Sequence, residues 1–313
     1  MRTKILDVLI IGTGAIGGYY GSRLAHGGHD VHFLLNSDYE YVKEHGLTVD
    51  SHFGDFSLPK PNVYSNIKDM PPCDLVCIAV KATANDNVFP HLTNVLKKDS
   101  AILLLQNGFG YEQQLAEIYP DHPIIGGLCF ISSFRDGPGT IRHTDYGKIT
   151  LTILQEKYLS VLKDVANVFS NAGIETETKA NLVEARIRKL MWNIPYNGMS
   201  VIANCKTDTL SSDPAMRELT RAIMDELLEA AEACGTPIEA AFADEMVKLT
   251  DLMSAYSPSM RLDFLAGRPM EIDAIYSNFI RYASEHGYEM RFAKMIKWQL
   301  EYLQTQNETP NLK

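Results

Sequence analysis

Short apolar runs recur through the first half of the chain, and polar stretches with helical periodicity separate them. The apolar runs predict buried strands at residues 5–11, 30–35, 75–80, 101–105 and 124–130. Helices are expected at residues 12–26, 38–45, 87–98, 111–119 and 158–172. Two further runs, residues 139–143 and 148–154, are expected to form an antiparallel edge. This alternation is typical of a parallel sheet with helices on both faces.

The pattern changes at residue 180, after which strand-like runs disappear. Helical periodicity dominates, and it predicts helices at residues 215–234, 237–254, 271–287 and 291–306. We therefore predict an α/β plus all-α protein, with a Rossmann dinucleotide-binding domain over residues 1–179 and an all-helical domain over residues 180–313.

Composition narrows the range of partners. The 313 residues carry 29 basic and 39 acidic side chains, so the net charge of -10 offers no broad basic face for nucleic acid. No apolar run approaches the ~20 residues that a membrane-spanning helix needs. The five cysteines are an odd number without regular spacing, which indicates reduced thiols rather than disulfides. A cytoplasmic protein with no nucleic-acid or membrane partner is expected.

A glycine-rich turn between the first predicted strand and helix is the strongest local motif. It reads Gly12, Thr13, Gly14, Ala15, Ile16 and Gly17. Gly12 would permit the tight turn, Gly14 would let backbone amides approach a pyrophosphate, and Gly17 would let the helix pack closely on the strand. The motif indicates nucleotide binding, with an ordinary glycine-rich turn as the alternative.

The tip of the second predicted strand bears no charge that would select a nucleotide. An acidic side chain there would hold a ribose hydroxyl, and an arginine would hold a 2′-phosphate. This chain has Asn36 followed by Ser37, and Asp38 comes two residues after Asn36. The residues alone leave the choice between NADH and NADPH open.

Two polar positions directly follow predicted sheet strands. Lys81 comes after the strand at residues 75–80, and Asn107 comes shortly after the strand at residues 101–105. Open α/β sheets bind ligands at this carboxyl edge. A surface lysine and a common Asn-Gly turn are the alternatives. Their place beside the glycine-rich turn favours a ligand-binding role.

A predicted helix in the second half of the chain carries three polar residues at a regular interval of four positions. Lys189, Asn193 and Asn197 follow each other at intervals of four, so they share one face of the helix. Pro195 is expected to bend this helix. The face is either a solvent-exposed polar stripe or the wall of a site.

Two later residues could serve either a ligand or the local fold. Ser259 could cap a helix or donate a hydrogen bond to a ligand. Glu271 is expected to open the following helix, where the helix dipole stabilises a carboxylate. A capping role is the alternative to ligand binding at Glu271.

No metal site is expected from the histidines and cysteines. The candidate histidines are His26, His29 and His32. They fall at a helix end, in a turn and on a strand, so no single geometry gathers them. Cys73 and Cys77 lack a second pair of ligands, and His143, on a predicted edge strand, is expected to be structural.

Taken together, these motifs resemble the ketopantoate reductases (2-dehydropantoate 2-reductases) over essentially the whole chain. The matching elements are the glycine-rich turn, Val80 with Lys81, Gln106 with Asn107 and Gly108, Pro138 and Gly139 with Ile141 and His143, the Lys189–Asn193–Asn197 spacing, and the segment from Ser259 and Met260 through Gly267 and Arg268 to Glu271, Ile272 and Asp273. The resemblance implies an NADPH-binding Rossmann domain and a helical substrate-binding domain of the 6-phosphogluconate-dehydrogenase C-terminal type. It also implies reduction of ketopantoate to pantoate, in pantothenate and coenzyme A biosynthesis.

The resemblance also implies roles for individual residues. Lys189 would be the general acid at the carbonyl oxygen, and Glu271 would bind the substrate hydroxyl and orient Lys189. The substrate would be bound by Asn107, Lys189, Asn193, Asn197, Ser259 and Glu271. The cofactor would be bound by the glycine-rich turn, Asn36, Lys81 and Asn107.

Two positions depart from the family pattern, and alternatives follow. Many family members carry an arginine where this chain has Asn36, so NADH stays an alternative to NADPH. Thr207, with Asn204 nearby, stands where some members have a third substrate-side asparagine. Two other functions are alternatives: a reductase of another branched 2-oxo acid, and a non-catalytic NAD(P)-binding sensor. A sensor, however, has no chemical need for Lys189 and Glu271. The amphipathic helices could be buried internally or in a homodimer.

Overall fold

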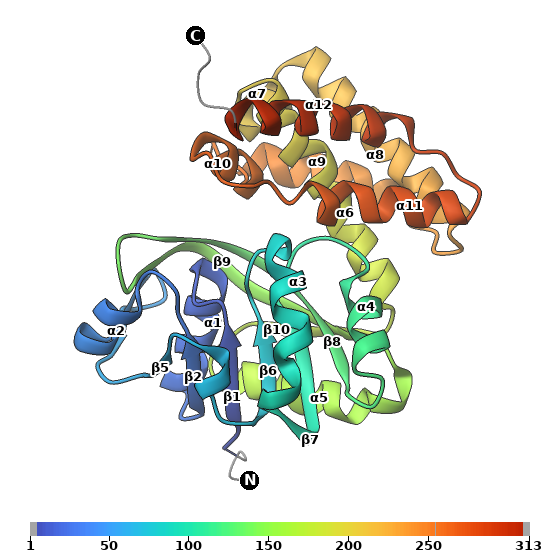
Figure 1. The fold of residues 1–313 in the computed structure, drawn as a ribbon. Helices are drawn as coiled ribbons and strands as arrows, with labels where there is room; N and C mark the ends of the chain where they lie inside the picture. The colour runs from blue at the N-terminus through green and yellow to red at the C-terminus, as the bar shows by residue number, and fades with distance from the viewer. Residues whose placement is uncertain (1–4, 254, 309–313) are drawn as a thin grey trace. The chain divides into compact units, whose positions relative to one another are not determined.

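The computed structural model describes residues 5–253 and 255–308, and it forms two compact units, whose elements are labelled in Figure 1. The first unit comprises the described residues up to Gln106 together with Tyr111–Leu182. The second comprises Asn107–Gly110 and the described residues from Val183 onward. The short segment Asn107–Gly110, which follows a strand of the first unit, therefore belongs to the second.

The first unit is built on a ten-stranded sheet in the order β4-β3-β9-β8-β7-β6-β1-β2-β5, with β10 paired to β9. The strands are β1 (Asp7–Ile11), β2 (Asp30–Leu34), β3 (Leu47–Ser51), β4 (Phe56–Leu58), β5 (Asn62–Tyr64), β6 (Cys73–Ile78), β7 (Leu96–Leu104), β8 (Ile124–Arg135), β9 (Thr140–Ile153) and β10 (Thr176–Lys179). From β5 through β2, β1, β6 and β7 to β8, all neighbours are parallel. This is the Rossmann order, whose switch point lies between β1 and β6.

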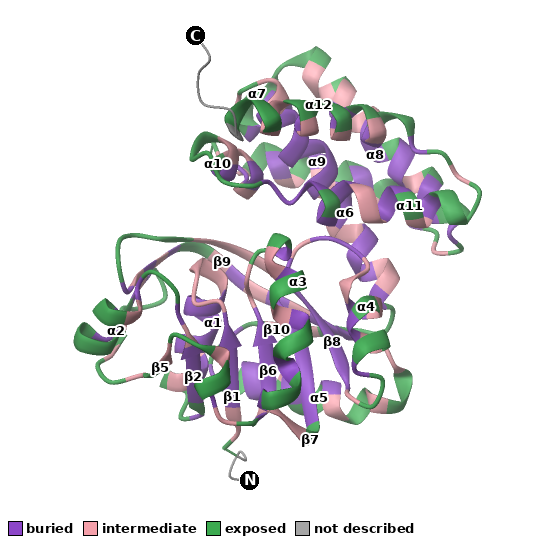
Figure 2. Cartoon of the chain, viewed as in Figure 1, coloured by how far each residue is buried: buried purple, intermediate pink, exposed green. Residues whose placement is uncertain are grey.

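Helices cover both faces of this sheet, as the sequence pattern predicts. Alternate residues of β1 face two separate cores: Val8 and Ile10 pack with residues of α1 (Ala15–His26) and α5 (Leu159–Asn171). Leu9 and Ile11 pack with residues of η3 (Phe89–Val95) and α4 (Tyr111–Ile118). Central strands are therefore buried on both sides, which explains their continuous apolar runs (Figure 2). The smaller elements of the unit are α2 (Tyr39–His45), η1 (Ile67–Asp69), η2 (Ala82–Ala84), α3 (Asn85–Val88) and η4 (Glu156–Tyr158).

Two expectations about the sheet are wrong, and four of its strands are not predicted from the sequence. Residues 139–143 and 148–154 are one long strand, β9, antiparallel to β8 but interior, because β3 and β10 pair with its other side. The helix expected at residues 87–98 is mostly short 3-10 turns, and β7 already begins at Leu96. The sequence pattern does not predict strands β3, β4, β5 and β10, because each has only three to five residues, too few for an alternating pattern to be distinguished from a loop.

The second unit is helical among its described residues. Its helices are α6 (Leu182–Ile202), α7 (Thr207–Ser212), α8 (Pro214–Ala233), α9 (Ala240–Leu252), α10 (Ser259–Leu265), the π-helical turn η5 (Asp273–Ser277), α11 (Asn278–Glu285) and α12 (Arg291–Glu308). The four helices expected from residue 215 onward are present, and residue 254, the predicted end of one, lies outside the described residues. Helix α6 continues through Pro195.

Candidate functional site

The glycine-rich turn between β1 and α1 has the geometry that a phosphate-binding loop needs. Gly12 has a φ of 97°, a conformation that L side chains rarely adopt. A Cβ on Gly17 would lie 2.2 Å from the Gly12 carbonyl oxygen, so only glycine lets α1 start this close to β1. A Cβ on Gly14, in contrast, would meet no atom within 4 Å. Gly14 thus leaves open space in front of the first turn of α1.

That first turn can receive an anion. The first backbone amides of a helix have no partner within the helix, and the helix dipole makes this end positive. Gly14, the residue at the N-terminal cap, offers no side-chain hydrogen bond, and the first turn of α1 carries no acidic side chain. A pyrophosphate therefore fits here without competition or repulsion from the chain.

A cavity of about 410 Å³ extends from this turn along the carboxyl ends of β1 and β2. Its described lining comprises Gly12, Thr13, Gly14, Leu34, Leu35, Asn36, Ser37, Asp38, Ser65, Asn66, Ile67, Val80, Asn87, Val88 and Arg135. It lies at the β1/β6 switch point, where doubly wound sheets bind nucleotides. The open glycine and the helix end together fit the pyrophosphate of a dinucleotide.

The sequence did not reveal Arg135 as a part of this cavity. Its guanidinium pairs with both carboxylate oxygens of Asp38, although the two residues are 97 positions apart. Asn36, in contrast, lies exposed in the lining, where the sequence placed it. No local pattern links Arg135 to Asn36 or Asp38, because only the pairing of β8 with β9 brings the end of β8 to this loop.

The ends of β6 and β7 are joined at the same edge of the sheet. The Gln106 side-chain amide donates to the Val80 carbonyl (2.8 Å) and to Asn85 Oδ1 (2.7 Å). Lys81, directly after Val80, is exposed, and its carbonyl accepts a bond from the Ala84 amide. Lys81 thus stands at the carboxyl edge, as predicted, although it is not among the residues that line the cavity.

Helix α6 presents the predicted polar face to its interior side rather than to solvent. Asn193 is 4% exposed and Asn197 is 2% exposed, while Lys189, one turn earlier, is partly exposed. An exposed polar stripe is therefore excluded for the two asparagines. Buried amides normally have hydrogen-bond partners, because an unpaired one costs free energy.

Two amide atoms on this face lack such partners among the described residues. They are the nitrogen Nδ2 of Asn193, a donor, and the oxygen Oδ1 of Asn197, an acceptor. Native proteins keep few such atoms, and a bound ligand is one way to satisfy them. This face of α6 can therefore bind a molecule that carries both an acceptor and a donor.

The segment Asn107–Gly110 and the helix after Glu271 pack on each other. The Phe109 amide donates to the Ala274 carbonyl (3.0 Å), and the Asn278 side chain donates to the Phe109 carbonyl (2.9 Å). Gly108 has a φ of 103°, and a Cβ there would lie 2.6 Å from the Ala274 carbonyl oxygen. The segment that carries Asn107 therefore packs on the helix that begins directly after Glu271.

The same element also reaches α6. The Tyr276 hydroxyl donates to the Ile194 carbonyl (2.8 Å), beside Asn193. Glu271 is 5% exposed and its carbonyl accepts the Ile275 amide, so it precedes the helix as predicted. Lys189, Asn193, Asn197, Asn107 and Glu271 therefore lie on packed neighbouring segments of the second unit.

Ser259 does not cap its helix, and the Thr207 hydroxyl is bonded to backbone. Ser259 is the first residue of α10, and Pro258 holds the cap position, so Ser259 is not the cap. The Thr207 hydroxyl donates to the Tyr256 carbonyl (3.2 Å) and accepts from the Tyr256 amide (3.2 Å). Thr207 thus fixes the segment that leads into Ser259 and is itself engaged by backbone.

His143 and the cysteines have structural surroundings. His143 is buried on the interior strand β9, where Nδ1 faces Ser51 Oγ (2.8 Å) and Nε2 faces two backbone carbonyls. Burial lowers the pKa of His143. Within residues 5–253 and 255–308, no group of three potential metal ligands comes together. All five cysteines are free, and burial raises the pKa of Cys73 to about 12.

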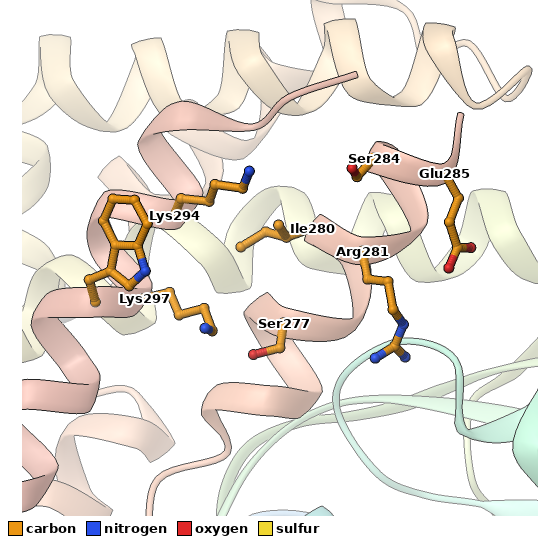
Figure 3. Close-up of a pocket in the computed structure, with 8 residues that line it drawn as sticks. Ser277, Ile280, Arg281, Ser284, Glu285, Lys294 and Lys297 are labelled. Atoms are coloured by element: carbon orange, nitrogen blue, oxygen red, sulfur yellow. The ribbon is translucent and has the colours of Figure 1, made fainter. Parts of the chain in front are cut away.

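A second hollow of about 410 Å³ lies between α11 and α12 (Figure 3). It is lined by Ser277, Ile280, Arg281, Ser284, Glu285, Lys294, Lys297 and Trp298. Lys294 pairs with Glu289 (2.9 Å), and Lys297 pairs with Glu301 (2.8 Å). These described lining residues include none of the predicted substrate-side residues, so the hollow is separate from the polar face of α6.

The Rossmann strand order, the open glycine turn and the helical second unit define a dinucleotide-binding protein of the two-domain oxidoreductase class. Comparison with known proteins sharpens this class. Residues 8–156 match the domain family "Ketopantoate reductase PanE/ApbA", and residues 181–301 match "Ketopantoate reductase PanE/ApbA C terminal". The chain belongs to the ketopantoate reductase family.

Individual relatives agree with this membership. A 2-dehydropantoate 2-reductase from Nostoc sp. is 42% identical over 97% of both chains. A crystal structure of 2-dehydropantoate 2-reductase from Geobacter metallireducens has 36% identity and a TM-score of 0.91, over 95% of this chain and 99% of that one. A D-mandelate dehydrogenase solved with NADH and anilino(oxo)acetate has a TM-score of 0.87 over 97% and 100% of the chains, but at 20% identity this shows a shared fold alone.

Proposed function

We propose that this chain is an NADPH-dependent reductase that converts ketopantoate to pantoate. Its family membership and the 42% identity to a 2-dehydropantoate 2-reductase support the reaction. The observation that carries the proposal is the pair of buried, unpartnered amide atoms on Asn193 and Asn197, on the helix of Lys189. A site with both an unpartnered donor and an unpartnered acceptor is built for a ligand that offers both.

Ketopantoate offers this combination. Its carboxylate and keto oxygens accept hydrogen bonds, and its terminal hydroxyl can donate one. Asn193 Nδ2 would donate to a carboxylate oxygen, and Asn197 Oδ1 would accept from the hydroxyl. Pyruvate and 2-oxoisovalerate lack the hydroxyl, so they would leave the Asn197 oxygen unpaired at a cost in binding. Ser259 and Asn107 would add further hydrogen bonds to the substrate.

In the proposed reaction, the nicotinamide supplies a hydride to the keto carbon when it is bound. Lys189 would donate a hydrogen bond and then a proton from Nζ to the carbonyl oxygen, so that the developing alkoxide becomes a hydroxyl. Glu271 would share the hydroxyl hydrogen with Asn197 Oδ1 in a three-centre bond and would orient the Lys189 ammonium, whose charge a neighbouring carboxylate favours. Carbon thus gains the hydride and oxygen gains the proton, and the product is a 2-hydroxy acid.

The nicotinamide cofactor is assigned to the cavity at the glycine-rich turn. The pyrophosphate would bind the amides at the start of α1, and Gly12, Thr13, Gly14, Ala15, Ile16 and Gly17 would form its loop. Asn36 would lie at the ribose, and Lys81 and Asn107 at the nicotinamide end. We infer NADPH rather than NADH, because Arg135 brings a positive charge to the part of the cavity that Asn36 lines.

The test is oxidation of reduced nicotinamide by the purified protein, with NADPH and NADH each run against ketopantoate, 2-oxoisovalerate and pyruvate. Fast turnover confined to ketopantoate is expected. Faster turnover of 2-oxoisovalerate would favour a reductase of another branched 2-oxo acid. Cofactor binding without turnover of any of the three acids would favour the sensor.

A homodimer stays a prediction, and the structure offers a surface for it. Along α12, Phe292, Met295, Trp298 and Tyr302 are exposed at helical spacing. We propose this face as a contact between two copies. Light scattering on the purified chain would give twice the monomer mass, and Trp298→Glu would return it to the monomer mass.

No described helix is long and apolar enough to cross a membrane, and a cytoplasmic location stays a prediction from the cysteines.

A further inference from the structure

We propose that Arg135, held in place by Asp38, recognises the 2′-phosphate of NADPH in place of the arginine that is missing at position 36. The inference rests on the proposed nucleotide site and names a specificity residue for it. Its basis is an ion pair at one end of the cavity, formed between the loop after β2 and the last residue of β8.

The Asp38 carboxylate is engaged on both oxygens. Oδ1 accepts from the Ser37 hydroxyl (3.0 Å) and from Arg135, and Oδ2 accepts from Arg135 and from the Gly139 amide (3.3 Å). Its side chain is only 10% exposed. An acid that reads a ribose 2′-hydroxyl needs an open acceptor. Both carboxylate oxygens of Asp38 already accept hydrogen bonds from the chain itself. Asp38 is therefore poorly placed to bind the ribose 2′-hydroxyl of NADH.

The Arg135 guanidinium is the more exposed partner of this ion pair. The Arg135 side chain is 42% exposed, and its bonds to Asp38 both use Nη2. The donors on Nε and Nη1 can therefore bind oxygens of a ligand while Nη2 stays on Asp38. Because the carboxylate already orders the arginine, a ligand has less side-chain freedom to remove when it binds.

The other lining residues at this end are neutral. Asn36 and Ser37 are exposed there and can donate hydrogen bonds, but a phosphate needs positive charge for tight binding. Within residues 5–253 and 255–308, Arg135 is the one lysine or arginine that lines this cavity. The family's usual arginine follows β2, whereas here the cation comes from β8 and reaches the same loop.

Calorimetric titration of NADPH, NADH and adenosine 2′,5′-bisphosphate measures this directly, without turnover. The wild-type chain should bind NADPH more tightly than NADH. Arg135→Gln should weaken NADPH and adenosine 2′,5′-bisphosphate about 10- to 100-fold, the range of one charge-assisted contact, and change NADH by less than about threefold. Arg135→Lys, which keeps the charge but loses the fork, should fall between.

Arg142→Gln is the matched control. Arg142 lies on the neighbouring strand β9 and is likewise held by ion pairs, in its case with Asp50 and Asp136, but it does not line the cavity. Its NADPH to NADH ratio should equal that of the wild type. Thermal unfolding of each variant identifies any that fail to fold, and Arg135→Lys then carries the comparison.

Other outcomes separate the inference from the reaction. The role of Arg135 would be overturned if Arg135→Gln left the ratio of the Kd values for NADPH and NADH unchanged. A wild-type chain that binds NADH more tightly than NADPH would also overturn it. If ketopantoate is still reduced in that case, the proposed function stands without it. If adenosine 2′,5′-bisphosphate binding depends on Arg135 but no 2-oxo acid is turned over, the phosphate site stands and the reductase proposal fails.

Discussion

The Tyr276 hydroxyl donates a hydrogen bond to the Ile194 carbonyl (2.8 Å), and this bond ties the helix that follows Glu271 to the helix that carries Lys189. Tyr276 is fully buried, and burial raises the pKa of its phenol, so the hydroxyl stays protonated and can donate. Gly198 makes room for it, because a Cβ there would lie 2.4 Å from the Tyr276 oxygen and 2.4 Å from Ile296 Cγ2.

Substitutions at this contact should therefore destabilise the helical unit. Tyr276→Phe should lower the free energy of unfolding by about 1 kcal/mol, the net value of one buried hydrogen bond. Gly198→Ala should lower it by about 1–3 kcal/mol through overpacking. Urea denaturation measures both. The double variant should cost less than the sum, because removing the hydroxyl relieves part of the clash; strict additivity would contradict the contact.

Substitutions in the glycine-rich turn should affect cofactor binding and folding stability separately. Gly14→Ala should leave thermal stability nearly unchanged, because its Cβ meets open space and its φ of -84° suits alanine. It should nevertheless weaken NADPH about tenfold or more, since the methyl group occupies the approach of the pyrophosphate. Gly17→Ala should act mainly on folding. It should lower the free energy of unfolding by about 1–3 kcal/mol, because its Cβ meets the Gly12 carbonyl oxygen.

Calorimetry and thermal unfolding on the two variants provide the comparison. Equal loss of stability in both would mean that Gly14 is a packing residue and that its open surroundings do not serve a ligand.

Lys189 should affect turnover far more than cofactor binding. Lys189→Ala removes the proposed proton donor, so kcat with ketopantoate should fall about 10²- to 10⁴-fold, the usual range for a general acid. The Kd for NADPH should change by less than about threefold. Arg188→Ala is the matched control at the preceding position of α6, where Arg188 pairs with Glu184 and Glu239. Equal losses of turnover and NADPH affinity in Lys189→Ala would remove it from the catalytic role.

His143 should make stability depend on pH. Burial lowers its pKa from the ordinary value of 6.5, so the folded chain binds its proton less readily than the unfolded chain does. Its contribution is full above pH 6.5 and is lost as the pH falls below that value. The free energy of unfolding should therefore drop between about pH 7 and 5, and His143→Gln should flatten part of the slope. The pKa of His29 is also lowered by burial, so part of the slope should remain. An unchanged slope in His143→Gln would contradict this assignment.

Much of the first unit could be predicted from sequence because its signals are local. Each glycine of the turn has the backbone property that its spacing predicts, as the φ of Gly12 and the close packing at Gly17 show. The four-residue spacing of Lys189, Asn193 and Asn197 likewise predicts one helical face. Periodicity predicts which residues share a face, but it does not tell whether that face is buried; the burial of both asparagines settles it.

The remaining features depend on long-range pairing. Arg135 reaches Asp38 only because β8 and β9 pair over their lengths, and the interior place of β9 depends on β3 and β10. Phe109 binds Ala274 far along the chain, so the assignment of Asn107–Gly110 to the helical unit has no local signal. An apolar or polar pattern records burial and not the identity of the neighbour.

An isotope label on the cofactor shows whether its hydrogen reaches the substrate. NADPH carrying deuterium at the transferable position of nicotinamide C4 is incubated with the protein and ketopantoate, and the product is analysed by mass spectrometry. We expect pantoate with one deuterium on C2, formed by the wild-type chain and nearly absent with Lys189→Ala. Failure to form labelled pantoate while NADPH binds would contradict the proposed reaction.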